Sequence, residues 1–93
     1  MSPKSKWPLK TLIEVEWVDI ASHNNGWMTI EETLKTIHPA LCRTVGYLIG
    51  SDKLNIRLAM LQTIEDNSIG MTMVIPKGCI LKIRKIKFLE ALQ

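Results

Sequence analysis

The feature that most constrains the fold is a series of short segments in which apolar residues occupy every second position. In the first of these segments, Val45, Tyr47 and Ile49 alternate with other residues. Three more segments follow along the chain: residues 54–60, 69–75 and 79–86. Apolar side chains at every second position are typical of β-strands that bury one face. The second half of the chain is therefore predicted to consist of strands.

Turn-forming residues separate these predicted strands. They lie in three clusters: residues 50–53, 65–68 and 76–78. Asn, Asp, Ser and Gly favour tight turns, and Pro fixes the backbone angle φ that the first turn position needs. Strands joined by such short turns pair as hairpins. The sequence therefore predicts an antiparallel arrangement.

One further strand is predicted before these four. Ile13, Val15 and Trp17 form an alternating apolar series, in which Trp17 is expected to belong to the core. The strand ends in the loop sequence Ser-His-Asn-Asn-Gly, residues 22–26.

The segment after this loop carries helix signals. Thr29 and Glu32 have the spacing of a capping box, in which the threonine hydroxyl accepts from the Glu32 N–H and the Glu32 side chain reaches back. Residues at helical spacing form one apolar stripe: Ile30, Leu34 and Ile37. Pro39 is expected to end the helix near His38.

Together these elements predict a mainly β fold with one helix between the first and second strands. Five short antiparallel strands and a Pro-Gly corner before the last one favour a strongly bent sheet or a small SH3-like or Sm-like barrel. The alternative is an open antiparallel sheet with the helix packed across it. We expect a basic N-terminal segment at 1–10, a single β-barrel domain at 11–87 and a tail at 88–93. Because so small a sheet leaves strand edges, a homo-oligomer is expected.

Composition supports a globular domain. Of the 93 residues, 46% are apolar and 23% are charged, and no apolar run approaches the roughly 20 residues of a membrane-spanning helix. The N-terminal residues do not resemble a secretory signal, so a cytoplasmic location is expected, in the host cell if the gene belongs to a phage. Cys42 and Cys79 are then expected to be free thiols, with a disulfide as the alternative.

Charge is distributed unevenly along the chain. Eight of the twelve basic residues lie near the two ends, whereas residues 11–76 carry a net charge of −4. If the ends meet, they form a basic face that would attract nucleic acid or an acidic partner. The candidate contacts on this face are Lys77, Lys82, Arg84 and Lys85. The alternative is that these side chains only keep the protein soluble.

Motifs for catalysis are weak, and no enzyme or cofactor is predicted. A metal site would need His23, His38, Cys42 and Cys79, but Pro39 prevents the helix that would align the central pair. A cysteine–histidine nucleophile from the same central pair lacks an orienting third group. Neighbours in sequence rarely reach the geometry of a hydrolase triad, so one built from Asp19, Ser22 and His23 is not expected. No metal site is predicted.

Four residues are candidates for binding a ligand. Trp27 follows a glycine-containing loop, so it is either a platform on which a base stacks or a lid over the end of the sheet. Arg43 and Arg57 have the forked guanidinium that binds phosphate, although each can equally be a solvated surface residue. Tyr47 is expected in the core with its hydroxyl at a rim, where it would meet a ligand.

Several short strings resemble a group of small proteins encoded by tailed bacteriophages. The strings are Val15-Glu16-Trp17-Val18-Asp19, Gly26-Trp27, Cys42-Arg43-Thr44-Val45-Gly46-Tyr47-Leu48, Leu58-Ala59 and Ile75-Pro76-Lys77-Gly78-Cys79-Ile80. The strand order from Cys42 onward is also similar to that of Sm-like and other SH3-like barrels. In Sm-like proteins the helix precedes all five strands. Because the helix here follows a first strand, no Sm-type RNA-binding residue is carried over. Some phage proteins of this size block host immunity by sequestering nucleotide signals, and the resemblance is compatible with that role.

Three functions are therefore considered. The first is a non-catalytic oligomeric protein that holds a small anionic ligand, such as a nucleotide immune signal, between subunits. The second is an Sm-like nucleic-acid binder, whose affinity would fall steeply with salt. The third is a protein–protein adaptor or inhibitor that uses a sheet edge or the tail around Phe88.

Overall fold

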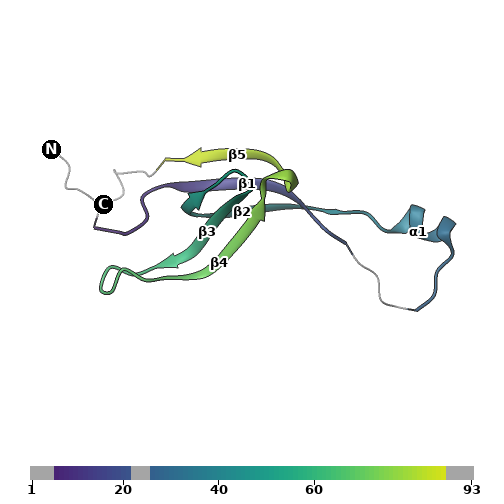
Figure 1. Ribbon diagram of the computed structural model, residues 1–93, viewed down its shortest axis with the longest axis horizontal. Coiled ribbons are helices and arrows are strands. Elements are labelled where there is room, and N and C mark those ends of the chain that lie inside the picture. The colour runs from purple at the N-terminus through teal and green to yellow at the C-terminus, as the bar shows by residue number, and fades with distance from the viewer. Residues whose placement is uncertain (1–5, 22–25, 88–93) are drawn as a thin grey trace.

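The computed structural model describes residues 6–21 and 26–87 as one five-stranded antiparallel sheet and one helix (Figure 1). The order of strands across the sheet is β4-β3-β2-β1-β5. The elements are β1 (Leu12–Asp19), α1 (Ile30–Thr36), β2 (Ala40–Ser51), β3 (Asn55–Gln62), β4 (Ile69–Pro76), the 3₁₀ turn η1 (Lys77–Cys79) and β5 (Ile80–Ile86). The predictions of a mainly β chain and of a helix after the first strand are confirmed. The sheet is not closed, because β4 and β5 are its two edges.

The sheet is organised around the long strand β2. Its first part, from Ala40 to Tyr47, pairs with β1, and its last part, from Tyr47 to Ser51, pairs with β3. The β3–β4 hairpin therefore runs at an angle to the layer of β1, β2 and β5 (Figure 1). Gly46 is buried near the change of partner, and a Cβ atom there would lie 3.2 Å from the carbonyl oxygen of Ala59. The close approach of β2 and β3 thus depends on a residue without a side chain.

The core lies on one face of this bent sheet. Its buried side chains come from β1, β3 and β4: Ile13, Val15, Ile56, Leu58 and Ile75. Trp17 packs against them, as predicted, and its indole Nε1 donates a hydrogen bond of 2.9 Å to Thr44 Oγ1. The alternation of the sequence is explained by this arrangement, because the same face of each strand enters the core.

The helix begins where the sequence indicates but lies away from the sheet. Thr29 Oγ1 accepts the Glu32 N–H at 3.1 Å, so this half of the predicted capping box is present. The helix ends at Thr36, before the expected end near His38, and none of its residues is buried. The alternative fold places the helix across an open sheet. The position of the helix in that fold is wrong, because the helix lies away from the sheet (Figure 1).

We call residues 20–21 and 26–39 the extension. Figure 1 shows that it carries α1 to the far end of the long axis of the molecule. The chain measures 64 × 28 × 26 Å, and its radius of gyration is 18.2 Å. A compact domain of this length has a radius of gyration of about 12 Å. The difference shows that the chain does not fold into a single compact unit.

Among the residues in the described ranges, no helix is long and apolar enough to cross a membrane. The tail at 88–93 and residues 1–5 of the basic N-terminal segment lie outside the described residues.

Candidate binding surfaces

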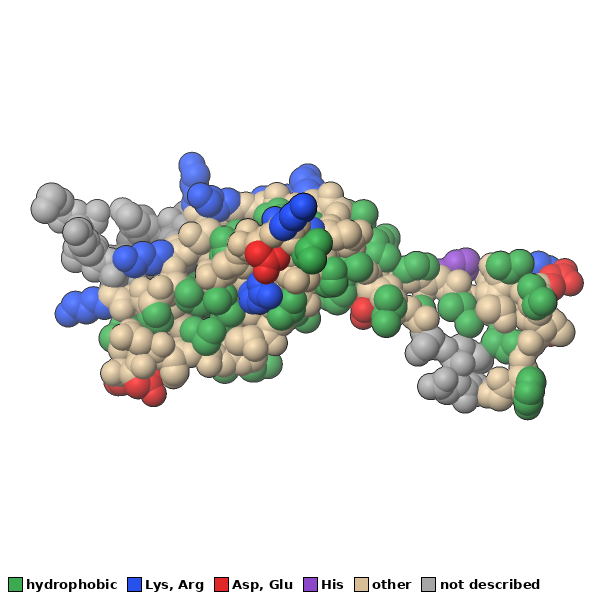
Figure 2. All heavy atoms as spheres, in the orientation of Figure 1, with side chains coloured by type: hydrophobic (Ala, Val, Ile, Leu, Met, Phe, Trp, Pro, Cys, Tyr) green, Lys and Arg blue, Asp and Glu red, His purple; other side chains and the backbone are tan. Residues whose placement is uncertain are grey.

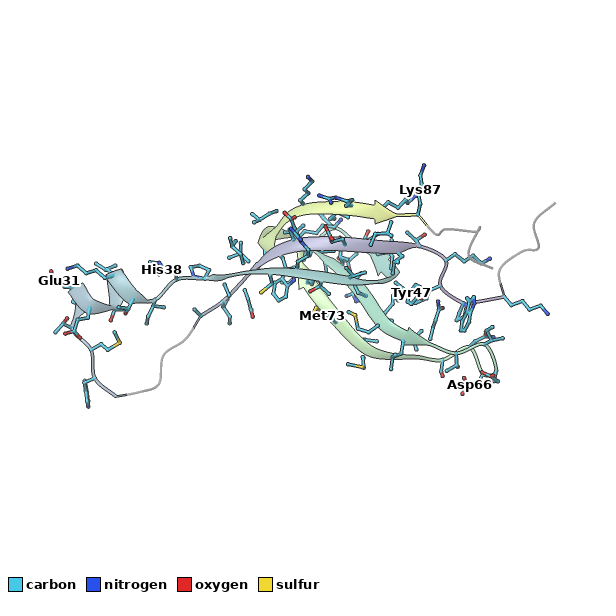
Figure 3. All side chains as sticks on the ribbon, turned by 180° about the vertical axis from the view of Figure 1, so that it is seen from behind. Glu31, His38, Tyr47, Asp66, Met73 and Lys87 are labelled. Atoms are coloured by element: carbon cyan, nitrogen blue, oxygen red, sulfur yellow. The ribbon has the colours of Figure 1, made fainter. Side chains whose placement is uncertain are left out.

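The four predicted ligand-binding residues are not brought together in one chain. Trp27 lies just before α1 on the extension and is fully exposed, so it does not form a lid over its own sheet. Arg43 and Tyr47 lie on β2, and Arg57 lies on β3. Figure 3 shows the separation: Tyr47 lies in the sheet, whereas His38 lies on the extension.

Arg43 takes part in a row of charges across β2, β1 and β5. Its Nη2 lies 3.0 Å from Glu16 Oε1, and its Nε lies 3.8 Å from Glu14 Oε1. On the other side of β1, Arg84 Nη1 lies 3.7 Å from the same Glu14 oxygen. The strand register explains this row, because Glu16 lies opposite Arg43 and Glu14 lies opposite Arg84. Both arginines are therefore already engaged by carboxylates, and a phosphate would compete with them.

The predicted basic residues lie on one edge of the sheet but on more than one face. Lys77 is in η1, and the other three are in β5, where Lys82 and Arg84 share a face. Lys85 lies on the opposite face, because successive side chains of a strand alternate. We call Lys77, Lys82, Arg84 and Lys85 the basic edge. Within the described part of the chain its three lysines form no ion pair, so the basic edge retains excess positive charge.

Arg57 stabilises a turn in the structure. Its Nη1 lies 2.8 Å from Asp52 Oδ2, and Asp52 Oδ1 accepts the backbone N–H groups of Leu54 and Asn55, each at 2.8 Å. The side-chain hydrogen bond from Arg57, followed by these backbone hydrogen bonds, lowers the pKa of Asp52 from 3.8 to about 2. Arg57 and Asp52 together hold the connection between β2 and β3.

Tyr47 lies at the junction of three strands. It is opposite Leu12 on one side and Ala59 on the other, and its side chain is half-buried. Ile13 and Val15 of the core alternate with Leu12 along β1, so Tyr47 lies on the other face of the sheet, and its predicted place in the core is wrong. Among the described residues, no arginine or lysine forms a hydrogen bond or ion pair with the Tyr47 side chain.

A hollow of about 290 Å³ lies where the extension leaves the sheet. Its lining residues come from β1, β2 and β5: Glu16, Trp17, Leu41, Cys42, Arg43 and Leu81. Leu41 of β2 and Leu81 of β5 are well exposed there, on either side of β1. Sequence analysis did not select these two residues. The available signal was weak, since Leu41 precedes the predicted strand and Leu81 is one apolar residue of a strand with apolar residues on both faces.

The extension exposes the apolar stripe that packs on the sheet in the alternative fold predicted from the sequence. Its exposed large side chains are Ile20, Trp27, Ile30 and Leu34. Burying one such aliphatic side chain is worth about 1.5–3 kcal/mol. A helix of seven residues is also far below the length of about 12–15 residues at which isolated helices become marginally stable in water. The extension is therefore a surface that gains stability when another surface covers it.

The residues considered for catalysis or metal binding form no cluster in the described parts of the chain. No group of three or more His, Cys, Asp or Glu residues suited to a metal ion occurs there. His38 Nε2 is 3.0 Å from the carbonyl oxygen of Lys35, and the Cys42 thiol contacts the carbonyl of Ala40 at 3.7 Å, so the two do not pair. Asp19 Oδ1 accepts the N–H of Ile20 at 2.8 Å. Ser22 and His23 lie outside the described residues.

Cys42 and Cys79 are free cysteines and are both half-buried.

Comparison of the chain with protein-family models, with curated proteins and with solved structures gave no match. The functional argument therefore rests on the surfaces described above.

Proposed function

We propose that the protein is a non-catalytic, self-associating binding protein that holds a small anionic ligand of nucleotide type between its copies. The observation that carries this proposal is that an exposed aromatic side chain and a group of lysines that form no ion pair with the described residues lie in different parts of one chain. The exposed indole of Trp27 lies on the extension, and the excess cations lie on the basic edge. A pocket that contains both an aromatic platform and lysines therefore needs more than one copy.

The ligand chemistry follows from these two features. A base stacks on the face of an indole in a way that tolerates any base, and ammonium groups bind phosphate as point charges. In this proposal Trp27 holds the base, and Lys77 and Lys82 neutralise the phosphates. Arg43 contributes only if the phosphate displaces the carboxylates of β1. The proposed ligand is thus recognised by its charge and by one flat ring.

We also propose a counter-defence role for such binding, as expected if the sequence belongs with the small phage proteins that it resembles. A protein that sequesters a nucleotide signal needs affinity and abundance but no catalytic group. The finer description of the fold belongs to the same proposal. The strand order β4-β3-β2-β1-β5, with η1 joining the two edge strands, would give an SH3-like or Sm-like barrel if the edges approached each other.

Native mass spectrometry of the protein purified gently from a bacterial host tests the proposal. We expect a homo-oligomer that carries a stoichiometric extra mass of a few hundred daltons, which is lost on denaturation. Titration with ATP as the probe then measures affinity. Trp27→Ala should weaken binding by about 1–3 kcal/mol, the value of one stacked base. Trp7→Ala is the matched control, because Trp7 lies outside the extension.

Two results would contradict the proposal. One is a bare monomer that binds no mononucleotide, and the other is Trp27→Ala with unchanged affinity and an unchanged fold. A mixed-sequence oligonucleotide that binds with a steep salt dependence, where ATP does not bind, would instead favour the nucleic-acid function.

A protein–protein adaptor is the second candidate, and the edge strand β4 favours it. An edge strand presents unpaired backbone groups to which a peptide can add as a further strand. Here the edge also exposes the large side chains of Met71 and Val74. A monomer without bound ligand in the mass measurement would support this candidate. The predicted contact at Phe88 lies outside the described residues.

A further inference from the structure

We propose that the extension of one copy docks on the hollow and the adjoining strand β5 of a second copy of this chain. The inference deepens the proposed function and rests on its claim of self-association. It names the two surfaces that meet.

The donor surface is the apolar stripe of the extension. Ile30 and Leu34 are 82% and 75% exposed, and α1 has no buried residue. Its own sheet does not cover it, because α1 lies at the far end of the long axis (Figure 1). The stripe therefore needs a surface outside the chain that carries it.

The acceptor surface is the hollow at the base of the extension. Leu41 and Leu81 line the hollow and are 78% and 62% exposed. The register of β5 against β1 shifts at Leu81, so Leu81 opens onto the face of the sheet that carries Arg43. Ile83 lies opposite Val15 on the core face and does not belong to this surface. Leu41 and Leu81 form an apolar strip that one face of a short helix can cover.

The charges of the two surfaces are opposite, which favours a second copy as the occupant. The first turn of α1 carries Glu31 and Glu32, and within residues 6–21 and 26–87 only Glu31 of the two has an ion pair, to Lys35 at 3.2 Å. The basic edge flanks the acceptor strip, and its lysines have no ion pair with the described residues. Figure 2 shows most of the lysines and arginines over the sheet, whereas the extension carries mainly apolar side chains and acidic side chains at its far end.

Each copy contains one donor and one acceptor surface, so the same contact recurs throughout the assembly. The contact also brings the extension, with Trp27 just before α1, to the basic edge of the second copy. The indole and the lysines of the proposed ligand pocket would then come from different copies.

The first test compares two leucine substitutions by sedimentation velocity over a range of protein concentrations. Leu34→Asp places a charge in the donor stripe and is expected to raise the dissociation constant of self-association roughly 10–100-fold, the effect of one buried leucine. Leu54→Asp is the matched control, because Leu54 is 69% exposed but lies at the turn between β2 and β3. It should associate like the unmodified protein. Circular dichroism of both variants checks that the sheet is intact.

The second test mixes two variants that fail separately. Leu81→Asp damages the acceptor and should also prevent association by itself. A mixture of Leu34→Asp and Leu81→Asp contains one intact donor and one intact acceptor, so we expect a mixed complex whose mass contains one of each chain. This complementation is specific to a donor that binds an acceptor, because two stripes that bound each other would not recover.

The outcomes separate this inference from the proposed function. If the unmodified chain and Leu34→Asp associate equally well, the docking contact is wrong, but the proposal of self-association is retained. Two variants that fail alone and fail when mixed also overturn it. An unmodified chain that stays monomeric at every concentration overturns both proposals, whereas recovery in the mixture supports the contact.

Discussion

The sheet and the extension use the same kind of sequence pattern with opposite results. In the sheet, the apolar positions of β1 and β3 are closed off from water, and Val15 and Leu58 are fully buried. In the extension, the apolar positions of α1 remain in water. The comparison teaches that periodicity identifies the face of an element that gains from burial. It does not identify the surface that covers this face.

Charged residues differ between the two regions in a similar way. In the sheet, Glu16 lies opposite Arg43 and Glu14 lies opposite Arg84, so these four residues form a row across three strands. In the extension, Glu31 and Lys35 form one local pair on the helix surface. Exposed pairs of this local kind contribute about 0.3–0.5 kcal/mol. They are too weak to hold a seven-residue helix without packing.

The largest expected effect sharpens the contrast between a buried and an exposed leucine. Leu58→Ala should lower the free energy of unfolding by about 2–5 kcal/mol, because it leaves a cavity in the core. Leu34→Ala should change it by less than about 0.5 kcal/mol in dilute solution, because the extension has no packing to lose. Urea denaturation at low protein concentration measures both. Equal losses would break the comparison and show that the extension packs within its own chain.

A smaller effect is expected from filling the close contact of β2 with β3. In Gly46→Ala, the new Cβ would lie 3.1 Å from Met60 Cε and 3.2 Å from the carbonyl oxygen of Ala59. Such overpacking typically lowers the free energy of unfolding by about 1–3 kcal/mol. Gly50→Ala is the control on the same strand, since nothing lies within 4 Å of its added Cβ. A denaturation midpoint for Gly46→Ala equal to that of Gly50→Ala would contradict the tight junction.

The smallest effect is a dependence of stability on pH at the turn between β2 and β3. The folded pKa of Asp52 is about 2, below the ordinary 3.8, because Arg57 and two backbone N–H groups bind its carboxylate. Its contribution is therefore present above about pH 4 and is lost as the pH falls towards 2. Asp52→Asn should have a lower melting temperature than the unmodified protein at pH 7 and nearly the same one at pH 2. A constant difference at both pH values would show that ionisation of Asp52 does not stabilise the turn.

The sequence predicted the strands well because each strand carries its own signal. Alternation and turn residues are local, so Val15 and Leu58 could be assigned to buried faces without knowledge of their partners. The N-terminal end of α1 was also predictable, since the Thr29 cap acts within one turn. The closure of the barrel and the packing of the helix were not predictable in this way. Both depend on contacts between distant segments, and here the edges β4 and β5 stay unpaired with each other.

The candidate site shows the same division. The sequence selected Trp27 and Arg43 by residue type, and Trp27 is indeed fully exposed. It could not show that Arg43 faces Glu14 and Glu16, because that pairing is set by the register of β1 against β2. The hollow beside Leu81 was missed for the same reason, since it forms only where β5 lies next to β1 and β2.

The amino-acid sequence by itself determined the number and type of the elements, the residues that face the core and the uneven distribution of charge. These properties come from local spacing, side-chain chemistry and turn preferences, which act over a few residues. The tertiary structure alone decided that the sheet stays open, that the extension projects from it and that the arginines are paired within the chain. These properties depend on which distant surfaces meet, and a stripe that meets none in its own chain is left for another chain to cover.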